Sequence, residues 1–168
     1  MVRTKPEWFT IRPPKGEFHN ITSIVKSHNL HTVCEEAHCP NMSECWSGGT
    51  ATFMVLGDTC TRACKFCAIK TSPNPNPPDP HEPENLANAL SKISKDLKYI
   101  VLTSVDRDDL SDQGANHIAL CIKSIKQKNP EMLVEVLIPD FRGEEKLIQT
   151  IIDSKPDVIA HNIETIER

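Results

Sequence analysis

Six of the seven cysteines lie within residues 34–67, and this clustering constrains the chain more than any other feature of its 168 residues. We expect reduced thiols, because no export signal is found and an odd number of cysteines cannot pair completely within one chain. Reduced, clustered thiols are typical of metal binding. The seventh cysteine, Cys121, is predicted to be a core thiol on the apolar face of a helix.

Charge and hydropathy argue against two classes of partner. The chain has 19 Lys and Arg against 23 Asp and Glu, a net charge of -4, so no cationic surface is expected for the phosphates of a nucleic acid. No segment approaches the roughly 20 apolar residues that span a bilayer. We therefore expect no nucleic acid, no membrane anchor, no secretory signal and a cytoplasmic location, with an organellar matrix as the alternative if a transit peptide is absent from this chain.

The apolar pattern after residue 49 predicts strands that alternate with helices. The strands are expected at 50–57, 99–105, 133–140 and 157–165, and the helices at 83–97, 114–129 and 144–154. The strands carry continuous apolar runs, as in parallel sheets with both faces covered. Because such crossovers are right-handed, the predicted fold class is α/β, a partial (β/α) barrel of about four βα units.

The chain divides at residue 49 into an N-terminal extension, 1–49, and the barrel part, 50–168. We expect an irregular arm in residues 1–32 with one helix near 21–29, followed by loops or short helical turns that a metal organises. Residues 72–83 hold six of the 13 prolines and are neither helix interior nor central strand. They are interpreted as an ordered connector, the alternative being a flexible linker.

Polar residues collect at the carboxyl ends of the predicted strands, where parallel α/β sheets place their sites. After the first strand comes a cysteine loop, and the later strand ends carry Thr103, Ser104, Asp106 to Asp109, Asp140, Arg142, His161, Asn162 and Glu164. Four separate loops are therefore expected to converge on one cavity.

The segment CTRACKFC places Cys60, Cys64 and Cys67 in a C-x3-C-x2-C pattern on one loop. Three soft thiolates can hold a four-iron cluster and leave one iron open for a small-molecule ligand. Zinc sites more often pair two C-x2-C units into four closed ligands. Zinc and buried structural thiols remain the alternatives.

This pattern, with Phe66 before the last cysteine and a strand in front of it, resembles the radical S-adenosylmethionine superfamily. The resemblance implies that the amino and carboxylate groups of S-adenosylmethionine bind the open iron. One-electron reduction then yields methionine and a 5′-deoxyadenosyl radical that abstracts hydrogen. We expect Phe66, Thr103, Ser104 and Asn162 to lie near this cofactor.

A second triplet, Cys34, Cys39 and Cys45, lies in VCEEAHCPNMSECW with the spacing C-x4-C-x5-C. Together with GDTCTRACKFC, TSVDRDDL, PDFRG and HNIET it closely resembles the lipoyl synthase family, from about His31 to the last residue. The resemblance implies a second, auxiliary [4Fe-4S] cluster on this triplet. Taken alone, the triplet also fits a structural zinc ion, or a disulfide with one free thiol.

The resemblance implies a sulfurtransferase that inserts two sulfur atoms at C6 and C8 of an octanoyl chain, with the second cluster as the sulfur source. That chain is carried on a lysine of a lipoyl carrier domain or a glycine cleavage H-type protein, and ferredoxin or flavodoxin is the expected electron donor. Unactivated C-H bonds lie beyond acid, base or thiolate chemistry. The cofactors therefore supply the hard step, and the protein supplies position and exclusion of water.

Several polar residues have two interpretations. Asp106, Arg107, Asp108 and Asp109 either contact the methionine part of the cofactor, as the resemblance implies, or form a charged loop that caps the next helix. His161 is interpreted as a structural residue rather than a cavity residue. Glu35 and Glu44, which flank the second triplet, are predicted to cap helices rather than to act as acids or bases.

The sequence departs from the lipoyl synthase pattern after HNIET. Members of the family continue with further strands and a serine that binds the second cluster, and no matching serine is found here. We expect four of six strands and an open sheet edge, and hence a truncated product, an incomplete gene model or half of a split enzyme, with poor solubility alone. A non-catalytic iron-sulfur fragment and a radical sulfur inserter with another substrate stay open as alternatives.

Overall fold

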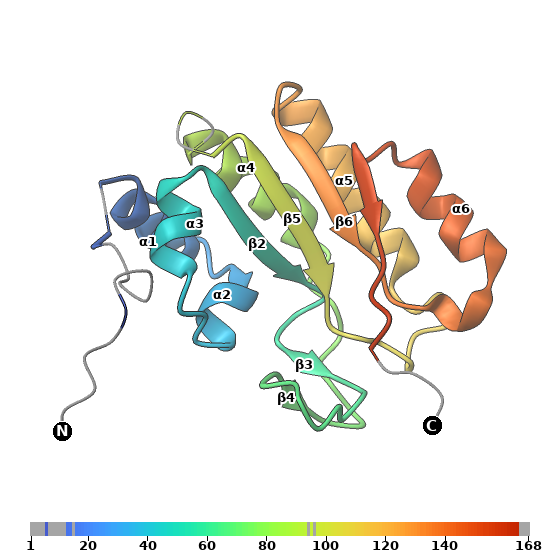
Figure 1. The fold of residues 1–168 in the computed structure, drawn as a ribbon. Coiled ribbons are helices and arrows are strands. Elements are labelled where there is room, and N and C mark those ends of the chain that lie inside the picture. Colours follow the sequence, from blue (N-terminus) through green and yellow to red (C-terminus); the bar gives the residue numbers. More distant parts are fainter. Residues whose placement is uncertain (1–5, 7–12, 15, 94, 96, 165–168) are drawn as a thin grey trace, which may run out of the picture.

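The computed structural model describes residues 6, 13, 14, 16–93, 95 and 97–164 (Figure 1). In the described residues the longest sheet has the strand order β1-β2-β5-β6-β7. Its four parallel strands are β2 (Thr50–Val55), β5 (Tyr99–Ser104), β6 (Leu133–Leu137) and β7 (Val158–Ala160).

A helix follows each of the first three parallel strands, as the sequence predicted. These helices are α4 (Glu82–Ile93), α5 (Ala115–Lys128) and α6 (Glu145–Asp153), and all three lie on one face of the sheet (Figure 1). Sequential strand order with the three crossover helices on one face is the arrangement of a (β/α) barrel, whereas a doubly wound sheet has helices on both faces. The predicted partial barrel is confirmed.

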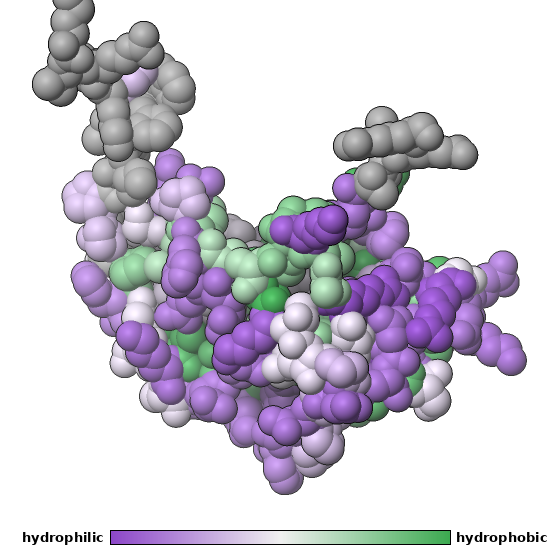
Figure 2. All heavy atoms as spheres, turned by 90° about the horizontal axis from the view of Figure 1, so that it is seen from below, coloured by the Kyte–Doolittle hydropathy of each residue, from purple (hydrophilic) through white to green (hydrophobic). Residues whose placement is uncertain are grey.

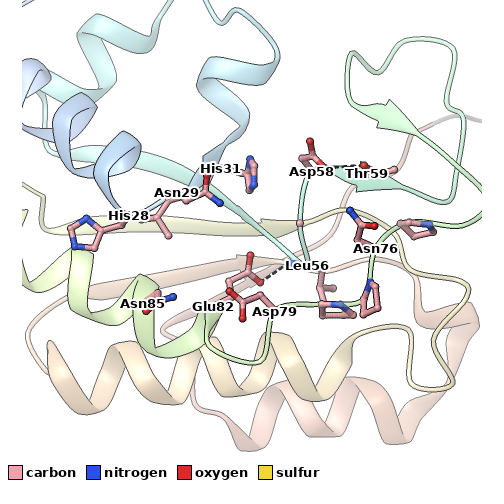
Figure 3. A pocket seen from close by; sticks show the side chains of 15 residues that line it. His28, Asn29, His31, Leu56, Asp58, Thr59, Asn76, Asp79, Glu82 and Asn85 are labelled. Carbon is pink, nitrogen blue, oxygen red and sulfur yellow. Dashed lines mark hydrogen bonds between the residues drawn. The ribbon is translucent and has the colours of Figure 1, made fainter.

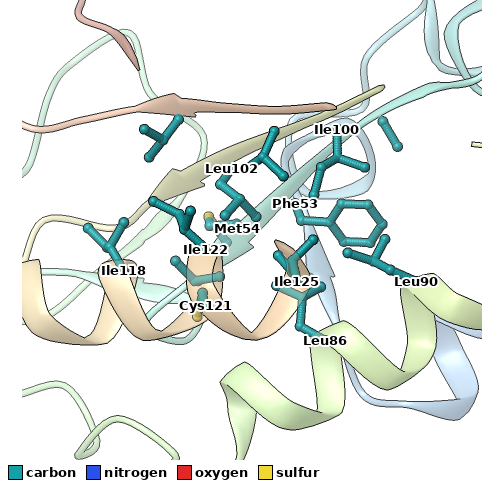
Figure 4. Close-up of a cluster of buried hydrophobic side chains, with 14 of the residues drawn as sticks. Phe53, Met54, Leu86, Leu90, Ile100, Leu102, Ile118, Cys121, Ile122 and Ile125 are labelled. Atoms are coloured by element: carbon teal, nitrogen blue, oxygen red, sulfur yellow. The ribbon is translucent and has the colours of Figure 1, made fainter. Parts of the chain in front are cut away.

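The core lies between the sheet and helices α4 and α5 (Figure 4). Leu86, Leu90 and Ile93 follow the helical period along α4 and are at most 2% exposed. Cys121 is fully buried among the isoleucines of α5, so the predicted core thiol is confirmed. Phe53 and Leu102, which are paired in the register of β2 and β5, pack from the sheet side.

The N-terminal extension packs on the sheet through helices and one short strand. Its elements are α1 (Gly16–Ser27), β1 (His31–Thr32), α2 (Val33–Glu36) and α3 (Met42–Ser47). The rings of Phe18 on α1 and Trp46 on α3 lie 5.4 Å apart, and Trp46 is fully buried. Helix α1 begins five residues before the predicted start, and the antiparallel pairing of β1 with β2 was not predicted.

All four predicted strands are shorter in the structure, and the third and fourth differ most from the prediction. The third ends at Leu137 rather than at Asp140, because Pro139 has no N-H and the backbone of Phe141 turns to a positive φ of 45°. The fourth ends at Ala160, and residue 165 of the predicted strand lies outside the described residues. Strand β7 leaves Val158 and Ile159 about 40% exposed, with fractions of 42% and 41%.

Candidate metal centres

A cavity of about 540 Å³ opens at the carboxyl ends of the parallel strands. Figure 2 shows this end of the molecule, where apolar side chains gather among hydrophilic ones. The expected convergence of four loops is found, because the lining includes Cys60, Cys64, Cys67, Phe66, Thr103, Ser104, Asp106, Asp140, His161, Asn162 and Glu164. Apolar side chains from the strands and their flanks complete the wall: Val33, Met54, Ile69, Val105, Leu137, Ile138 and Pro139.

The first cysteine triplet lies on a loop that is closed at its base. Strand β3 (Thr59–Cys60) pairs in parallel with β4 (Lys70–Thr71), and the Ser72 N-H donates to the Cys60 carbonyl at 3.0 Å. Cys60 is nearly buried, whereas Cys64 and Cys67 are exposed. The loop therefore presents three thiols to one cavity from a fixed base.

Arg62, inside this loop, is bound by the ends of two strands. Its guanidinium donates to both carboxylate oxygens of Asp108, at 2.8 and 2.9 Å, and to both of Asp140, at 3.1 and 2.9 Å. Asp106 lies 3.7 Å from it. These carboxylates raise the pKa of Arg62, and Arg62 in turn holds the pKa of Asp108 well below its usual range.

The four charged residues of VDRDDL have two roles that alternate along the segment. The first and third contact the cysteine loop, and the second and fourth bind each other. Asp106 lines the cavity, and its carboxylate lies 3.8 Å from the Cys60 Sγ. Burial raises the pKa of Asp106, partly offset by the charge of Arg62. Arg107 points inward, is only 2% exposed, and donates to both oxygens of Asp109 at 2.8 and 2.9 Å.

The remaining residues of the cavity come together as predicted, and one of them, His161, contacts the backbone of a neighbouring strand end. The His161 Nδ1 lies 2.9 Å from the Ile138 carbonyl, which is a structural contact, but the side chain also lines the cavity, so the two interpretations of His161 do not exclude each other. Phe66 is 71% exposed although it lines the cavity. Sequence reasoning missed Arg62, and the available signal was a cation inside the cysteine loop with carboxylates after two later strands.

The second triplet is held by α2, α3 and the turn between them. The Thr32 hydroxyl caps α2 by accepting from the Glu35 N-H at 3.2 Å, and it donates to the Glu35 carboxylate at 3.1 Å, so the capping residue is Thr32 and Glu35 binds it. The Cys39 N-H donates to the Cys34 carbonyl at 3.0 Å. Cys45 lies on α3, one residue after Glu44, which is in the first turn of that helix.

The charges around the two triplets affect one thiol of each. Burial raises the pKa of Cys45, and the charges of Cys34, Cys39 and Glu44 raise it further. Burial likewise raises the pKa of Cys60, and hydrogen bonds from the backbone of Arg62 and Asp106 offset part of this. Thiolates that repel one another call for a cation among them, so each donor set fits a soft metal centre.

The number of thiols in each triplet favours a four-iron cluster over a single zinc ion. All seven cysteines are free, which removes the disulfide alternative for the second triplet. Among the described residues, three ligand atoms within 4.8 Å of one another are found at Glu82, His117 and Cys121, and at neither cysteine triplet. Three thiols can hold a four-iron cluster with one iron open, whereas structural zinc sites usually have four protein ligands.

The comparison with known families agrees with this geometry. The profile of the Radical SAM superfamily matches residues 54–168. The chain is 59% identical over 171 residues to a lipoyl synthase of Halobacterium salinarum, covering 99% of this chain and 54% of that protein. It is 55% identical to a mitochondrial lipoyl synthase of Picea sitchensis and 52% identical to a lipoyl synthase of Halorhodospira halophila, covering 43% and 49% of them.

The chain spans about half the length of these curated relatives. Radical SAM proteins use S-adenosylmethionine with a [4Fe-4S] cluster, and two such clusters are typical of lipoyl synthases. In the described part of the chain, no helix is long and apolar enough to cross a membrane.

Proposed function

The chain belongs to the radical SAM superfamily, and on that premise we propose that it acts in lipoyl synthesis. The proposed reaction is the radical insertion of two sulfur atoms at C6 and C8 of an octanoyl chain. That chain is bound to a lysine of a lipoyl carrier domain, or of a glycine cleavage H-type protein. The observation that carries this proposal is the placement of Cys60, Cys64 and Cys67 in one cavity with the ends of four parallel strands.

We assign one cluster to each cysteine triplet. Cys60, Cys64 and Cys67 are the proposed ligands of the cluster that binds S-adenosylmethionine, and Cys34, Cys39 and Cys45 those of the auxiliary cluster. Residues 1–49 would then be the auxiliary-cluster extension, and residues 50–168 the radical SAM unit. When bound, the first cluster supplies one-electron reduction of S-adenosylmethionine, and hence a radical able to abstract hydrogen from an unactivated carbon.

The side chains of the cavity suit such a reaction in two ways. Thr103, Ser104 and Asn162 supply hydroxyl and amide groups for the polar part of S-adenosylmethionine. Met54, Leu137 and Ile138 supply an apolar wall against which an alkyl chain and a radical are shielded from water. Phe66, exposed at the rim, offers a flat face for an adenine ring or an alkyl chain.

The proposed setting follows from the chemistry of the thiols. Seven free cysteines suit a reducing compartment, so we place the protein in the cytoplasm or in an organellar matrix. The reaction consumes electrons, and a ferredoxin or flavodoxin is the proposed donor.

Counting iron in triplet variants tests this assignment. After anaerobic reconstitution, two four-iron clusters predict about eight irons per chain, and alanine at all three cysteines of either triplet predicts about four. Cys121→Ser is the matched control, because this thiol is buried in the core and is expected to leave the iron content unchanged. Negligible iron in the unsubstituted chain, or zinc in its place, would contradict the assignment.

Turnover then separates the enzyme from a cluster-binding fragment. The reconstituted chain is incubated with reductant, S-adenosylmethionine and octanoylated carrier domain, and 5′-deoxyadenosine and sulfur-containing product are measured. Both products are expected. Clusters without 5′-deoxyadenosine would identify a non-catalytic fragment, and 5′-deoxyadenosine without thiolated octanoyl would indicate another substrate.

A further inference from the structure

The chain leaves the sheet for the cysteine loop through a turn at Leu56 and Gly57. Leu56 has a φ of 70° and Gly57 a φ of 89°, although Leu56 is a leucine and only 2% exposed. A left-handed backbone brings the Cβ of a leucine close to the following carbonyl, so this conformation persists only where the surroundings enforce it.

Glu82, in the first turn of α4, holds the amide of this turn. The Leu56 N-H donates to the Glu82 Oε2 at 2.9 Å, and Figure 3 shows the carboxylate directed at the Leu56 backbone. The same Oε2 lies 2.6 Å from the Nε2 of His117 on α5. Both side chains are largely buried, with exposed fractions of 14% and 13%. The acceptor is therefore itself fixed by a second helix.

Arg107 holds the carbonyl of the same residue. Its Nη1 donates to the Leu56 carbonyl at 3.3 Å, and its other nitrogens are bound by Asp109. On the side-chain side, Leu56 packs against Gly114, where an added Cβ would lie 2.3 Å from the Leu56 Cδ1. Both polar backbone groups and the side chain of Leu56 are thus held by residues distant in sequence.

A metal site does not account for this arrangement. Glu82, His117 and Cys121 have zinc-binding side chains, and their ligand atoms lie within 4.8 Å of one another. Two ligands of one tetrahedral zinc ion stand about 3.3 Å apart, given bonds of about 2.0 to 2.1 Å. The Glu82 and His117 atoms are separated by 2.6 Å, which is the distance of a hydrogen bond.

The contacts that hold Leu56 also affect the cysteine loop, because Cys60 follows only four residues later. Within that loop the Thr61 N-H donates to the Asp106 carbonyl at 2.9 Å, and Arg62 is bound to Asp108. Residues 106–109 therefore bind the chain on both sides of Cys60. Arg107 binds the turn before Cys60, and Asp106 and Asp108 bind the residues after it.

We propose that Glu82 and Arg107 are positioning residues which hold the left-handed turn at Leu56 and thereby set the position of Cys60 for cluster binding. This inference rests on the proposed function, since it takes Cys60 to be a cluster ligand. Neither side chain lines the cysteine cavity, so the effect passes through the backbone from Leu56 to Cys60.

The test uses the chain in which Cys34, Cys39 and Cys45 are alanine, so that bound iron reports on the first triplet alone. Glu82→Ala is expected to speed the loss of iron to a chelator about tenfold, the factor expected when one hydrogen bond to a charged group is lost. Hydrogen exchange at the Leu56 amide should accelerate with it. Glu82→Gln keeps an acceptor oxygen and should restore most of the iron retention.

Glu84→Ala is the matched control, because Glu84 is exposed in the same first turn of α4. It should leave iron loss and amide exchange unchanged. Arg107→Lys, which replaces the guanidinium fork by one ammonium group, should speed iron loss as Glu82→Ala does. Circular dichroism identifies any variant that fails to fold, and Glu82→Gln then decides the result.

The outcomes separate the two proposals. The reference chain has alanine at the second triplet and no other substitution. If it binds no iron at Cys60, Cys64 and Cys67, the proposed function fails and this inference fails with it. If it binds iron, and folded Glu82→Ala and Arg107→Lys release it at the same rate, only the positioning role is overturned. Equal iron loss in Glu82→Gln and Glu82→Ala would also overturn it, because the acceptor oxygen would then be irrelevant.

Discussion

The guanidinium of Arg62 donates two hydrogen bonds to the carboxylate of Asp108, one from Nε and one from Nη2. These residues are 46 positions apart, one inside the cysteine loop and the other after the second parallel strand. A planar fork on a carboxylate fixes orientation as well as distance. The loop is thereby tied to the sheet by charge, since most of its side chains are not buried.

Replacing Arg62 tests this tie. Arg62→Lys keeps the charge but loses the fork, and we expect it to lower the free energy of unfolding by about 1 kcal/mol, since the pair is partly exposed. Proteolytic nicking of residues 60–70 should accelerate. Lys65→Ala, at an exposed position of the same loop, is the control and should change neither quantity. Equal behaviour of the two variants would show that Arg62 does not organise the loop.

The depressed pKa of Asp108 predicts a dependence of stability on pH. Arg62 favours the charged carboxylate in the folded state, so this contribution is complete above the unfolded pKa of about 3.9 and is lost as the pH falls below it. In Asp108→Asn, the free energy of unfolding should decrease less steeply with falling pH below about pH 4. Urea denaturation between pH 3 and pH 7 measures it, with exposed Asp153→Asn as the control. An unchanged slope in Asp108→Asn would contradict the prediction.

Two glycine substitutions separate backbone strain from steric overlap. Gly57 and Gly114 both have positive φ, 89° and 85°, but only at Gly114 would a Cβ collide with Leu56. Gly57→Ala should cost about 1 to 2 kcal/mol for its left-handed backbone alone. Gly114→Ala should cost clearly more, because the buried Leu56 side chain must move. Chemical denaturation gives both values, and equal losses would show that the contact between Gly114 and Leu56 is soft.

The burial of Trp46 predicts that two substitutions at this position lower the stability by different amounts. Its ring is fully buried against Phe18, while its Nε1 is buried without a hydrogen-bond partner among the described residues. Trp46→Ala should cost about 3 to 5 kcal/mol through the cavity that it leaves. Trp46→Phe removes the unpaired N-H as well as part of the ring, so it should cost much less. Similar losses for both variants, measured by denaturation, would indicate a partner for Nε1.

The exposed strand β7 predicts the solubility of the chain. Val158 and Ile159 lie on the outermost strand of the described sheet and are about 40% exposed, so they offer a template for pairing with other copies. Ile159→Lys should reduce light scattering in concentrated samples. Leu120→Lys also replaces an exposed apolar residue by a charge, but on α5, and serves as the control. Equal improvement in both variants would assign the effect to net charge rather than to the edge.

The sequence predicted the parallel strands, their helices and the cavity because these depend on periodic apolar residues and on the direction of parallel strands. Strand β2, for example, was expected at 50–57 and ends at Val55, where Leu56 turns to a positive φ. That turn depends on Glu82 and Arg107, which are 26 and 51 positions away. No local pattern reports a contact of that kind.

The two-residue strands escaped prediction for a related reason. Strands β1 and β3 are too short to show any alternation, and each exists only through its partner. Helix α2 was predictable, because Thr32 and Glu35 have the spacing of a capping box.

The residues that bind Arg62 also impose an order on the assembly of the protein. Asp108 and Asp140 follow β5 and β6, so the loop with Cys60, Cys64 and Cys67 cannot take its final shape until about 140 residues of chain have been synthesised and those strands have paired. During translation, the nascent cysteine loop therefore reaches its final shape only after the sheet has formed. On the proposed assignment of a cluster to these cysteines, iron delivered before that time would meet thiols that Arg62 has not yet positioned.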